Sequence, residues 1–327
     1  MSTGAIHVAV GVVLSVTGEV LVARRSSDVH QGGLWEFPGG KQENQESSRQ
    51  ALQREIFEEL GLTIRKCRPF IQLHYQYPEK PVVLDVWLIE QWTGKPYGKE
   101  GQPISWVSVE KLSDIDFPPA NEAIIRALQL PSLYLISPGP TGDLDRFFAG
   151  IDACTRAGAK LLQLRCQEKL FHEKPQVIYE VRSICMANDA KLLLNSSPSM
   201  AVSFGAHGVH LNSVRLLQLN ERPLDREFWV SASCHNQTEL VHAARIGLDF
   251  IVLSPVMHTM SHPDAKPIGW EQFSRLAGIS NMPVYALGGM QPKHMYTAWR
   301  NGAQGLAMLS GVWGADDPAG IIRECGV

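Results

Sequence analysis

The sequence predicts two domains: an α+β domain with a mixed sheet and one strong helix, followed by a (β/α)₈ barrel. Three observations support this fold class. The length of 327 residues is about twice that of an average domain. The first part has strand-like runs around one strong helix. The second part repeats an apolar run followed by a helix-compatible stretch eight times within roughly 190 residues, slightly fewer than usual for such a barrel.

In the first domain, alternating or apolar runs predict strands, and the apolar spacing predicts one helix within the domain and one that closes it. We expect strands over residues 6–16, 20–24, 70–77 and 82–92, and helices over 47–60 and 121–130. Pro131 ends the closing helix, which places the boundary between residues 130 and 132. The domains are therefore predicted as 1–131 and 132–327.

The barrel strands are predicted from eight short apolar runs separated by polar, glycine-containing loops. They cover residues 133–137, 160–164, 191–194, 208–211, 228–233, 250–254, 283–286 and 305–309. The helix after the fourth run has the weakest pattern.

Composition excludes several function classes. Hydrophobic residues make up 44% and charged residues 19%, which is typical of a globular protein. The formal net charge is -3, and neither half is basic, so we expect no nucleic acid polymer as partner. No apolar run is long enough to span a membrane, and the N-terminus fits a first strand better than a signal peptide. Six cysteines without a CxxC pair indicate a reducing, cytoplasmic compartment.

The most specific chemical signal is a carboxylate triad in the first helix. Glu55, Glu58 and Glu59 are spaced i, i+3 and i+4 and therefore share one helix face. Like charges at this spacing repel one another unless a cation compensates, and oxygen ligands suit Mg²⁺ or Mn²⁺. Arg54 precedes Glu58 by four residues and can orient it. The alternative is an acidic helix face exposed to solvent.

The opposite face of this helix is apolar, with Leu52, Ile56 and Leu60, and Gly61 is a suitable C-terminal stop. Gly39 and Gly40 precede the helix and allow a tight loop whose backbone can approach a metal.

These residues resemble the Nudix box at every defined position. The matching residues are Gly40, Glu46, Arg54, Glu55, Ile56, Glu58, Glu59, Gly61 and Leu62. The Nudix family hydrolyses nucleoside diphosphates linked to another group, with metal bound by the box glutamates. The strings RRSSDVHQGGLWEFPGGK, YGKEGQP and DFPPANEAI resemble the MutT-type 8-oxo-dGTP diphosphatases, over roughly residues 5–130.

This resemblance implies further site residues. Glu100 and the backbone carbonyl of Gly39 would be metal ligands, although Glu100 can also be an exposed loop charge. Arg25 and His30 match positions near the nucleotide. Phe37 would line the base pocket, and Trp35 is equally compatible with core packing.

The resemblance also gives Asn121 a role in base recognition, with a helix N-cap as the alternative. In 8-oxoguanine N7 carries a hydrogen, whereas in guanine N7 is an acceptor beside the acceptor O6. One amide can accept from N7–H while it donates to O6. The same amide oxygen would face a lone pair on guanine, so the site would reject it.

The implied reaction is attack of water on the β-phosphorus of 8-oxo-dGTP or a related oxidised purine triphosphate, releasing the monophosphate and pyrophosphate. A box glutamate or Glu100 must accept the proton of the water, and Glu55 is our choice.

The second domain resembles thiamine phosphate synthase and its TenI-like relatives. The matching strings are LLQLR (161–165), GAHGVHL (205–211), ALGGMQP (286–292) and AMLSG (307–311). Gly288, Gly289, Ser310 and Gly311 fall where such barrels bind phosphate through backbone N–H groups, although these glycines can also serve the turns alone.

Three departures from the synthase pattern affect its substrate and metal groups. The pyrophosphate lysine is Gln167, and the two metal aspartates are Ser196 and Arg215. We therefore expect no thiamine phosphate synthesis, but a retained phosphate ligand. The alternatives are a Nudix hydrolase of a thiamine-pathway pyrophosphate, a bifunctional enzyme with an active synthase, and a barrel that senses a thiamine phosphate or holds a partner.

Overall fold

The computed structural model describes residues 5–27, 31–76, 81–259 and 264–326. Contacts divide the chain into two compact units, Met1–Gln129 with Gly278–Asn281 and Leu130–Ala277 with Met282–Val327. No helix in the described ranges is both long and apolar enough to cross a bilayer.

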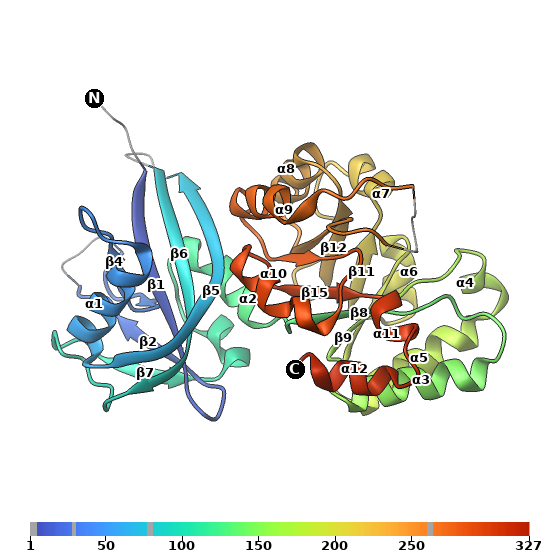
Figure 1. The fold of residues 1–327 in the computed structure, drawn as a ribbon, viewed down its shortest axis with the longest axis horizontal. Helices are drawn as coiled ribbons and strands as arrows, with labels where there is room; N and C mark the ends of the chain where they lie inside the picture. Colours follow the sequence, from blue (N-terminus) through green and yellow to red (C-terminus); the bar gives the residue numbers. More distant parts are fainter. Residues whose placement is uncertain (1–4, 28–30, 77–80, 260–263, 327) are drawn as a thin grey trace. The chain divides into compact units, whose positions relative to one another are not determined.

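The first unit is built on one seven-stranded mixed sheet (Figure 1). Its central path runs β3-β2-β1-β6-β5, while β4 pairs with β1 and β7 pairs with β2. Among the strand pairings of the described residues in this unit, only β1–β6 is parallel. The strands are β1 (Ile6–Leu14), β2 (Val20–Arg24), β3 (Trp35–Glu36), β4 (Gly39–Lys41), β5 (Thr63–Gln76), β6 (Pro81–Thr93) and β7 (Ile104–Val107).

The sheet of the first unit has a hydrophobic core on each face. Along β1, Ala9 and Val13 belong to the cluster under helix α1 (Ser48–Leu60), whereas Val10 and Val12 belong to the cluster with helix α2 (Glu122–Leu128). Alternate side chains of a strand point to opposite faces, so one strand supplies both cores. Gly11 lies under α1, because an added Cβ would stand 2.8 Å from Cδ1 of Ile56. Two short 3₁₀ helices, Val109–Asp114 and Pro119–Asn121, precede α2.

The second unit is a closed eight-stranded parallel barrel in the order β10-β11-β12-β13-β14-β15-β8-β9 (Figure 1). Its strands are β8 (Leu133–Ile136), β9 (Leu161–Leu164), β10 (Lys191–Leu194), β11 (Gly208–Leu211), β12 (Trp229–Cys234), β13 (Phe250–Leu253), β14 (Val284–Ala286) and β15 (Gly305–Met308).

The helices of the barrel pack against its outer face. They are α3 (Leu144–Arg156), α4 (Leu170–Glu173), α5 (Pro175–Ala187), α6 (Pro198–Ser203), α7 (Ser213–Gln218), α8 (Gln237–Arg245), α9 (Gly269–Gly278), the 3₁₀ helix Pro292–His294, α10 (Met295–Arg300), α11 (Ser310–Trp313) and α12 (Pro318–Glu324). The weak helix predicted after the fourth strand is the six-residue α7.

The barrel interior is filled at its amino-terminal end by aromatic side chains. Tyr134, Phe250 and Tyr285 are fully buried and pack edge to face or tilted against one another. Leu130 belongs to the same cluster. The backbone just before β8 is held here, because Gln304 Nε2 donates to the Leu130 carbonyl at 2.9 Å and the Tyr285 hydroxyl donates to the Pro131 carbonyl. Leu130 and Pro131, which precede the first barrel strand, thus belong to the folded barrel.

The predicted fold class is confirmed, and most predicted elements differ from the observed ones only at their ends. The strand predicted at 70–77 begins earlier, at Thr63, and the short strands β3, β4 and β7 are absent from the prediction. Unlike the barrel strands, these three strands are not marked by a continuous apolar run.

Candidate active site

Helix α1 is fixed at both ends by local sequence. Ser47 forms a capping box: its Oγ accepts from the Gln50 N–H at 3.4 Å, and its own N–H donates to Gln50 Oε1 at 2.9 Å. At the other end Gly61 adopts a left-handed conformation with φ 68°, and its N–H bonds the Phe57 carbonyl. Ala51, Leu52, Ile56 and Leu60 are buried against the sheet. The predicted apolar stripe and glycine stop are both present.

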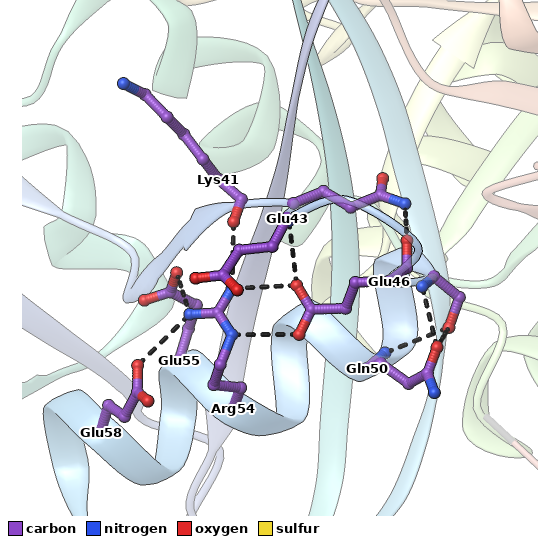
Figure 2. Close-up of polar contacts among 9 residues, drawn as sticks. Lys41, Glu43, Glu46, Gln50, Arg54, Glu55 and Glu58 are labelled. Carbon is purple, nitrogen blue, oxygen red and sulfur yellow. Dashed lines mark hydrogen bonds and ion pairs between the residues drawn. The ribbon is translucent and has the colours of Figure 1, made fainter.

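Arg54 organises the acidic side of α1 (Figure 2). Its guanidinium donates two hydrogen bonds to Glu46 at 3.0 Å, and Nη2 also donates to the Lys41 carbonyl at 3.1 Å. Its Nη1 donates to Glu55 at 2.8 Å and to Glu58 at 3.3 Å. The five donors of an arginine are thus all used. These bonds raise the pKa of Arg54, and they lower the pKa of the Glu46 carboxyl.

Glu59 differs from its neighbours, because no cationic side chain pairs with it within the described part of the chain. Its carboxylate accepts a hydrogen bond from the Gly39 N–H at 3.2 Å. Burial, the largest cause, acts with the charges of Glu55, Glu36 and Glu100 to raise the pKa of Glu59 from an ordinary 4.5 to about 8, and the hydrogen bond from Gly39 opposes this rise. Three other carboxylates therefore lie within electrostatic range of Glu59, and ionisation of Glu59 is costly in the folded chain.

At the two glycines before α1, neighbouring atoms come so close to the backbone that a side chain would collide with them. A Cβ on Gly39, which has φ +147°, would stand 2.1 Å from the Ala9 carbonyl oxygen. A Cβ on Gly40 would stand 2.1 Å from Oε1 of Glu55. Backbone without side chains therefore borders the Glu55 carboxylate.

Glu100 reaches this region because its loop is bound to the end of α1. The N–H of Lys99 donates to the Glu59 carbonyl at 2.9 Å, and that of Tyr97 donates to the Leu60 carbonyl at 3.3 Å. Glu58 lies at the edge of this carboxylate cluster, where its side chain is about half exposed and forms an ion pair with Arg54. In the described ranges no three acidic, histidine or cysteine side chains converge closely enough to hold a metal ion as they stand.

The donor set nevertheless fits a hard divalent cation. It consists of carboxylates and a backbone carbonyl, which are the ligands that Mg²⁺ and Mn²⁺ prefer. The buried charge of Glu59 is uncompensated, and a cation beside it would remove the electrostatic cost of its ionisation.

Glu36 is a residue that the sequence reasoning missed. It lies on β3 opposite Ala23 of β2, and its carboxylate forms an ion pair with Arg25. Burial raises the pKa of Glu36, and Arg25 opposes this shift. The signal was present as an acidic residue between the aromatic side chains Trp35 and Phe37, with an arginine eleven residues before it.

The segment expected to bind the base packs against the same sheet. Phe37 is buried and stacks on Phe117 with ring centroids 5.3 Å apart. Trp35 is partly buried, and its backbone N–H donates to the Asp116 carbonyl at 2.9 Å. His30 lies outside the described residues.

Asn121 occupies the N-cap position of α2 without making the capping hydrogen bond. Its side chain is only 8% exposed, and within the described part of the chain no hydrogen bond of its amide is found. The side chain of Asn121 is thus not engaged in capping α2.

The barrel has a separate cavity of about 710 Å³ at the carboxyl ends of its strands. Gly288, Gly289, Ser310 and Gly311 line it, as do polar side chains that include Gln163 and Arg165. A Cβ on Gly289, where φ is +68°, would stand 2.4 Å from the His258 carbonyl oxygen, so this glycine is also required by the turn itself. The Gln163 Oε1 atom is buried and has no hydrogen-bond partner among the residues that the structure describes.

The positions that depart from the synthase pattern have protein partners. Ser196 is fully buried, and its hydroxyl donates to the Ser197 carbonyl at 3.2 Å. Arg215 pairs with Glu168 at 3.4 Å, and Gln167 lines a second pocket beside the cavity. Neither Ser196 nor Arg215 supplies a carboxylate for a metal.

Comparisons with known proteins assign each unit to a family. The NUDIX domain model matches residues 9–127, and the thiamine monophosphate synthase model matches residues 133–312. The 8-oxo-dGTP diphosphatase of Escherichia coli is 43% identical over 124 residues, which are 38% of this chain and 96% of that protein. The corresponding enzyme of Haemophilus influenzae is 34% identical, over 38% of this chain and 90% of its own length.

The barrel has relatives of its own. The thiamine-phosphate synthase of Thioalkalivibrio sulfidiphilus is 28% identical, over 60% of this chain and 94% of that protein. The structure of a thiamine phosphate pyrophosphorylase from Pyrococcus furiosus matches the fold with a TM-score of 0.50 at 22% identity, over 60% of this chain and 93% of the other. The chain therefore belongs to the Nudix hydrolases through its N-terminal domain and to the thiamine monophosphate synthase family through its C-terminal domain.

Proposed function

We propose that the N-terminal domain hydrolyses 8-oxo-dGTP and related oxidised purine nucleoside triphosphates to the monophosphate and pyrophosphate, sanitising the nucleotide pool in the cytoplasm. The observation that carries the proposal is the position of Asn121, which is 8% exposed at the start of α2 and whose side chain does not cap this helix. The relatives named 8-oxo-dGTP diphosphatase support it. The six cysteines, all free thiols, support a reducing compartment.

The reaction requires Mg²⁺ or Mn²⁺ in this proposal. Gly39 through its carbonyl, together with Glu55, Glu58, Glu59 and Glu100, would hold the cation. When bound, it neutralises charge on the phosphates and lowers the pKa of an attacking water. Arg54 holds Glu55 and Glu58 on one side of α1, so their placement is set before substrate binds.

Other protein groups serve proton transfer and base recognition. Glu55 accepts the proton as water attacks the β-phosphorus, and the bond from this phosphorus to the oxygen bridging to the α-phosphorus breaks. The monophosphate leaves with that oxygen, and pyrophosphate carries the oxygen of the water. Arg25 and His30 lie near the nucleotide, and Phe37 borders the base. Asn121 accepts from N7–H of the base and donates to O6.

A comparison of substrates on the full chain tests this function. Pyrophosphate release is measured with 8-oxo-dGTP and dGTP, and orthophosphate release with the pyrimidine pyrophosphate used in thiamine synthesis, each with Mg²⁺ and with EDTA. We expect kcat/KM to be highest for 8-oxo-dGTP and activity to vanish in EDTA. A preference for the thiamine-pathway pyrophosphate would instead support the alternative hydrolase.

For the barrel, we propose a binding site for a phosphate-bearing ligand without thiamine phosphate synthesis. The cavity of about 710 Å³ and the buried Gln163 Oε1 atom, unpartnered within the described ranges, support a ligand. Synthase chemistry expels pyrophosphate, and its developing charge requires a metal held by carboxylates, which Ser196 and Arg215 do not offer. Thiamine phosphate formed from the pyrimidine pyrophosphate and thiazole phosphate would refute the second half of this proposal.

A further inference from the structure

The loop that carries Glu100 is held at the C-terminal end of α1 by the side chains of Lys99 and Gln102 as well as by backbone. The last carbonyls of a helix lack intrahelical partners. Here the Glu59 carbonyl accepts from the Lys99 N–H and also from Gln102 Nε2, both at 2.9 Å. The loop thus supplies the hydrogen-bond donors for a carbonyl that has no partner within the helix.

The same Gln102 amide also binds Glu100. Its Oε1 accepts from the Glu100 N–H at 2.9 Å, so donor and acceptor of one amide join residues 59 and 100. Gln102 is partly buried, whereas Glu100 is exposed. The loop is closed tightly around this contact, because a Cβ on Gly98 would stand 1.8 Å from the Gln102 carbonyl oxygen.

We propose that Gln102 is a positioning residue, which sets the distance between the carboxylates of Glu100 and Glu59. Both carboxylates belong to the same electrostatic cluster, and the amide fixes the backbone of one to the backbone of the other. Without it, the Glu100 N–H would bond to water and the loop would lose one of its attachments to α1. The inference rests on the proposed function, in which both glutamates hold the divalent cation.

The test measures Mn²⁺ binding to the full chain without nucleotide, from the electron paramagnetic resonance signal of free Mn²⁺. We compare wild type with Gln102→Met, Glu100→Gln and the double variant. We expect each single substitution to weaken Mn²⁺ binding about tenfold, because Gln102→Met removes a residue that orients a metal ligand and Glu100→Gln removes the charge of the ligand itself. The double variant should bind like Glu100→Gln, because Gln102 acts only through Glu100.

Gln53→Met is the matched control. Gln53 is exposed on α1, and its side chain has no hydrogen bond within the described ranges. We expect it to bind Mn²⁺ like wild type. If Gln102→Met does not fold, Gln102→Asn replaces it, since its stem is too short to join both partners.

Three results would overturn the inference: wild-type Mn²⁺ affinity in Gln102→Met, wild-type affinity in Glu100→Gln, or losses that multiply in the double variant. A chain that binds Mn²⁺ as expected but does not hydrolyse 8-oxo-dGTP would instead refute the proposed substrate, while leaving the role of Gln102 supported.

Discussion

Replacing Glu59 by Gln should stabilise the metal-free protein at alkaline pH. The rise in the pKa of Glu59 from 4.5 to about 8 means that the folded chain resists ionisation of this carboxyl. At about 1.36 kcal/mol per pKa unit, the rise corresponds to a loss of roughly 5 kcal/mol in the free energy of unfolding once Glu59 is ionised in the folded chain. Solvent screening at this partly exposed group reduces the effect, and we expect about 2 kcal/mol at pH 8.

The sign follows from proton binding. Between pH 4.5 and pH 8 the unfolded chain has lost the Glu59 proton and the folded chain still holds it, so stability falls as pH rises through this window. A glutamine side chain cannot ionise, and the Glu59→Gln variant should therefore lose this part of the pH dependence. At pH 4 the two proteins should differ little.

The difference in stability between wild type and Glu59→Gln is measured by thermal unfolding of the full chain in EDTA at pH 5 and pH 8. Hydrogen exchange of peptides from α1 shows which unfolding transition belongs to the N-terminal domain. Saturating Mg²⁺ should stabilise wild type and leave Glu59→Gln nearly unchanged, because the cation compensates the ionised carboxylate. Glu110→Gln, at an exposed carboxylate on a 3₁₀ helix, is the control. A Glu59→Gln variant that is less stable than wild type at pH 8 in EDTA would refute the reasoning.

Three further predictions concern catalysis and recognition. Glu58→Gln and Glu59→Gln should each lower kcat by at least ~10²-fold, roughly the loss of one electrostatic contact in the transition state, and near-normal turnover in steady-state assays of both would exclude these ligands. Asn121→Ala should reduce the preference for 8-oxo-dGTP over dGTP by roughly 1–3 kcal/mol in the ratio of kcat/KM values, and an unchanged ratio would remove Asn121 from base recognition. Gly40→Ala should abolish most hydrolysis at little cost in secondary structure by circular dichroism, because its Cβ would displace the Glu55 carboxylate; full activity would show that this close approach is not needed.

The fold could be predicted from sequence where the pattern is long. Helix α1 and its buried stripe follow from the spacing of Leu52, Ile56 and Leu60, and the eight barrel strands follow from repeated apolar runs. The strands β3, β4 and β7 could not be predicted, because their residues are placed by pairing with distant strands and not by their own pattern.

The site could be predicted in part for a similar reason. Spacing placed Glu55, Glu58 and Glu59 on one helix face, but a shared face does not determine which partner each side chain meets. Arg54 binds Glu55 and Glu58, whereas Glu59 turns to the Gly39 N–H. These contacts depend on loops before and after the helix. Glu36 joins the cluster only through a hairpin pairing that local sequence does not reveal.

The residues that lead into the barrel decide where the two domains can be cut apart. A barrel fragment that began at residue 132 would lack Leu130 and the two carbonyls that accept from Gln304 and Tyr285. Each lost hydrogen bond costs on the order of 1 kcal/mol, and the missing leucine would leave a void beneath the aromatic layer. A barrel expressed alone should therefore begin at Leu130 or earlier. The segment that connects the domains is consequently not an interchangeable linker, since its sequence is constrained by the folding of the barrel itself.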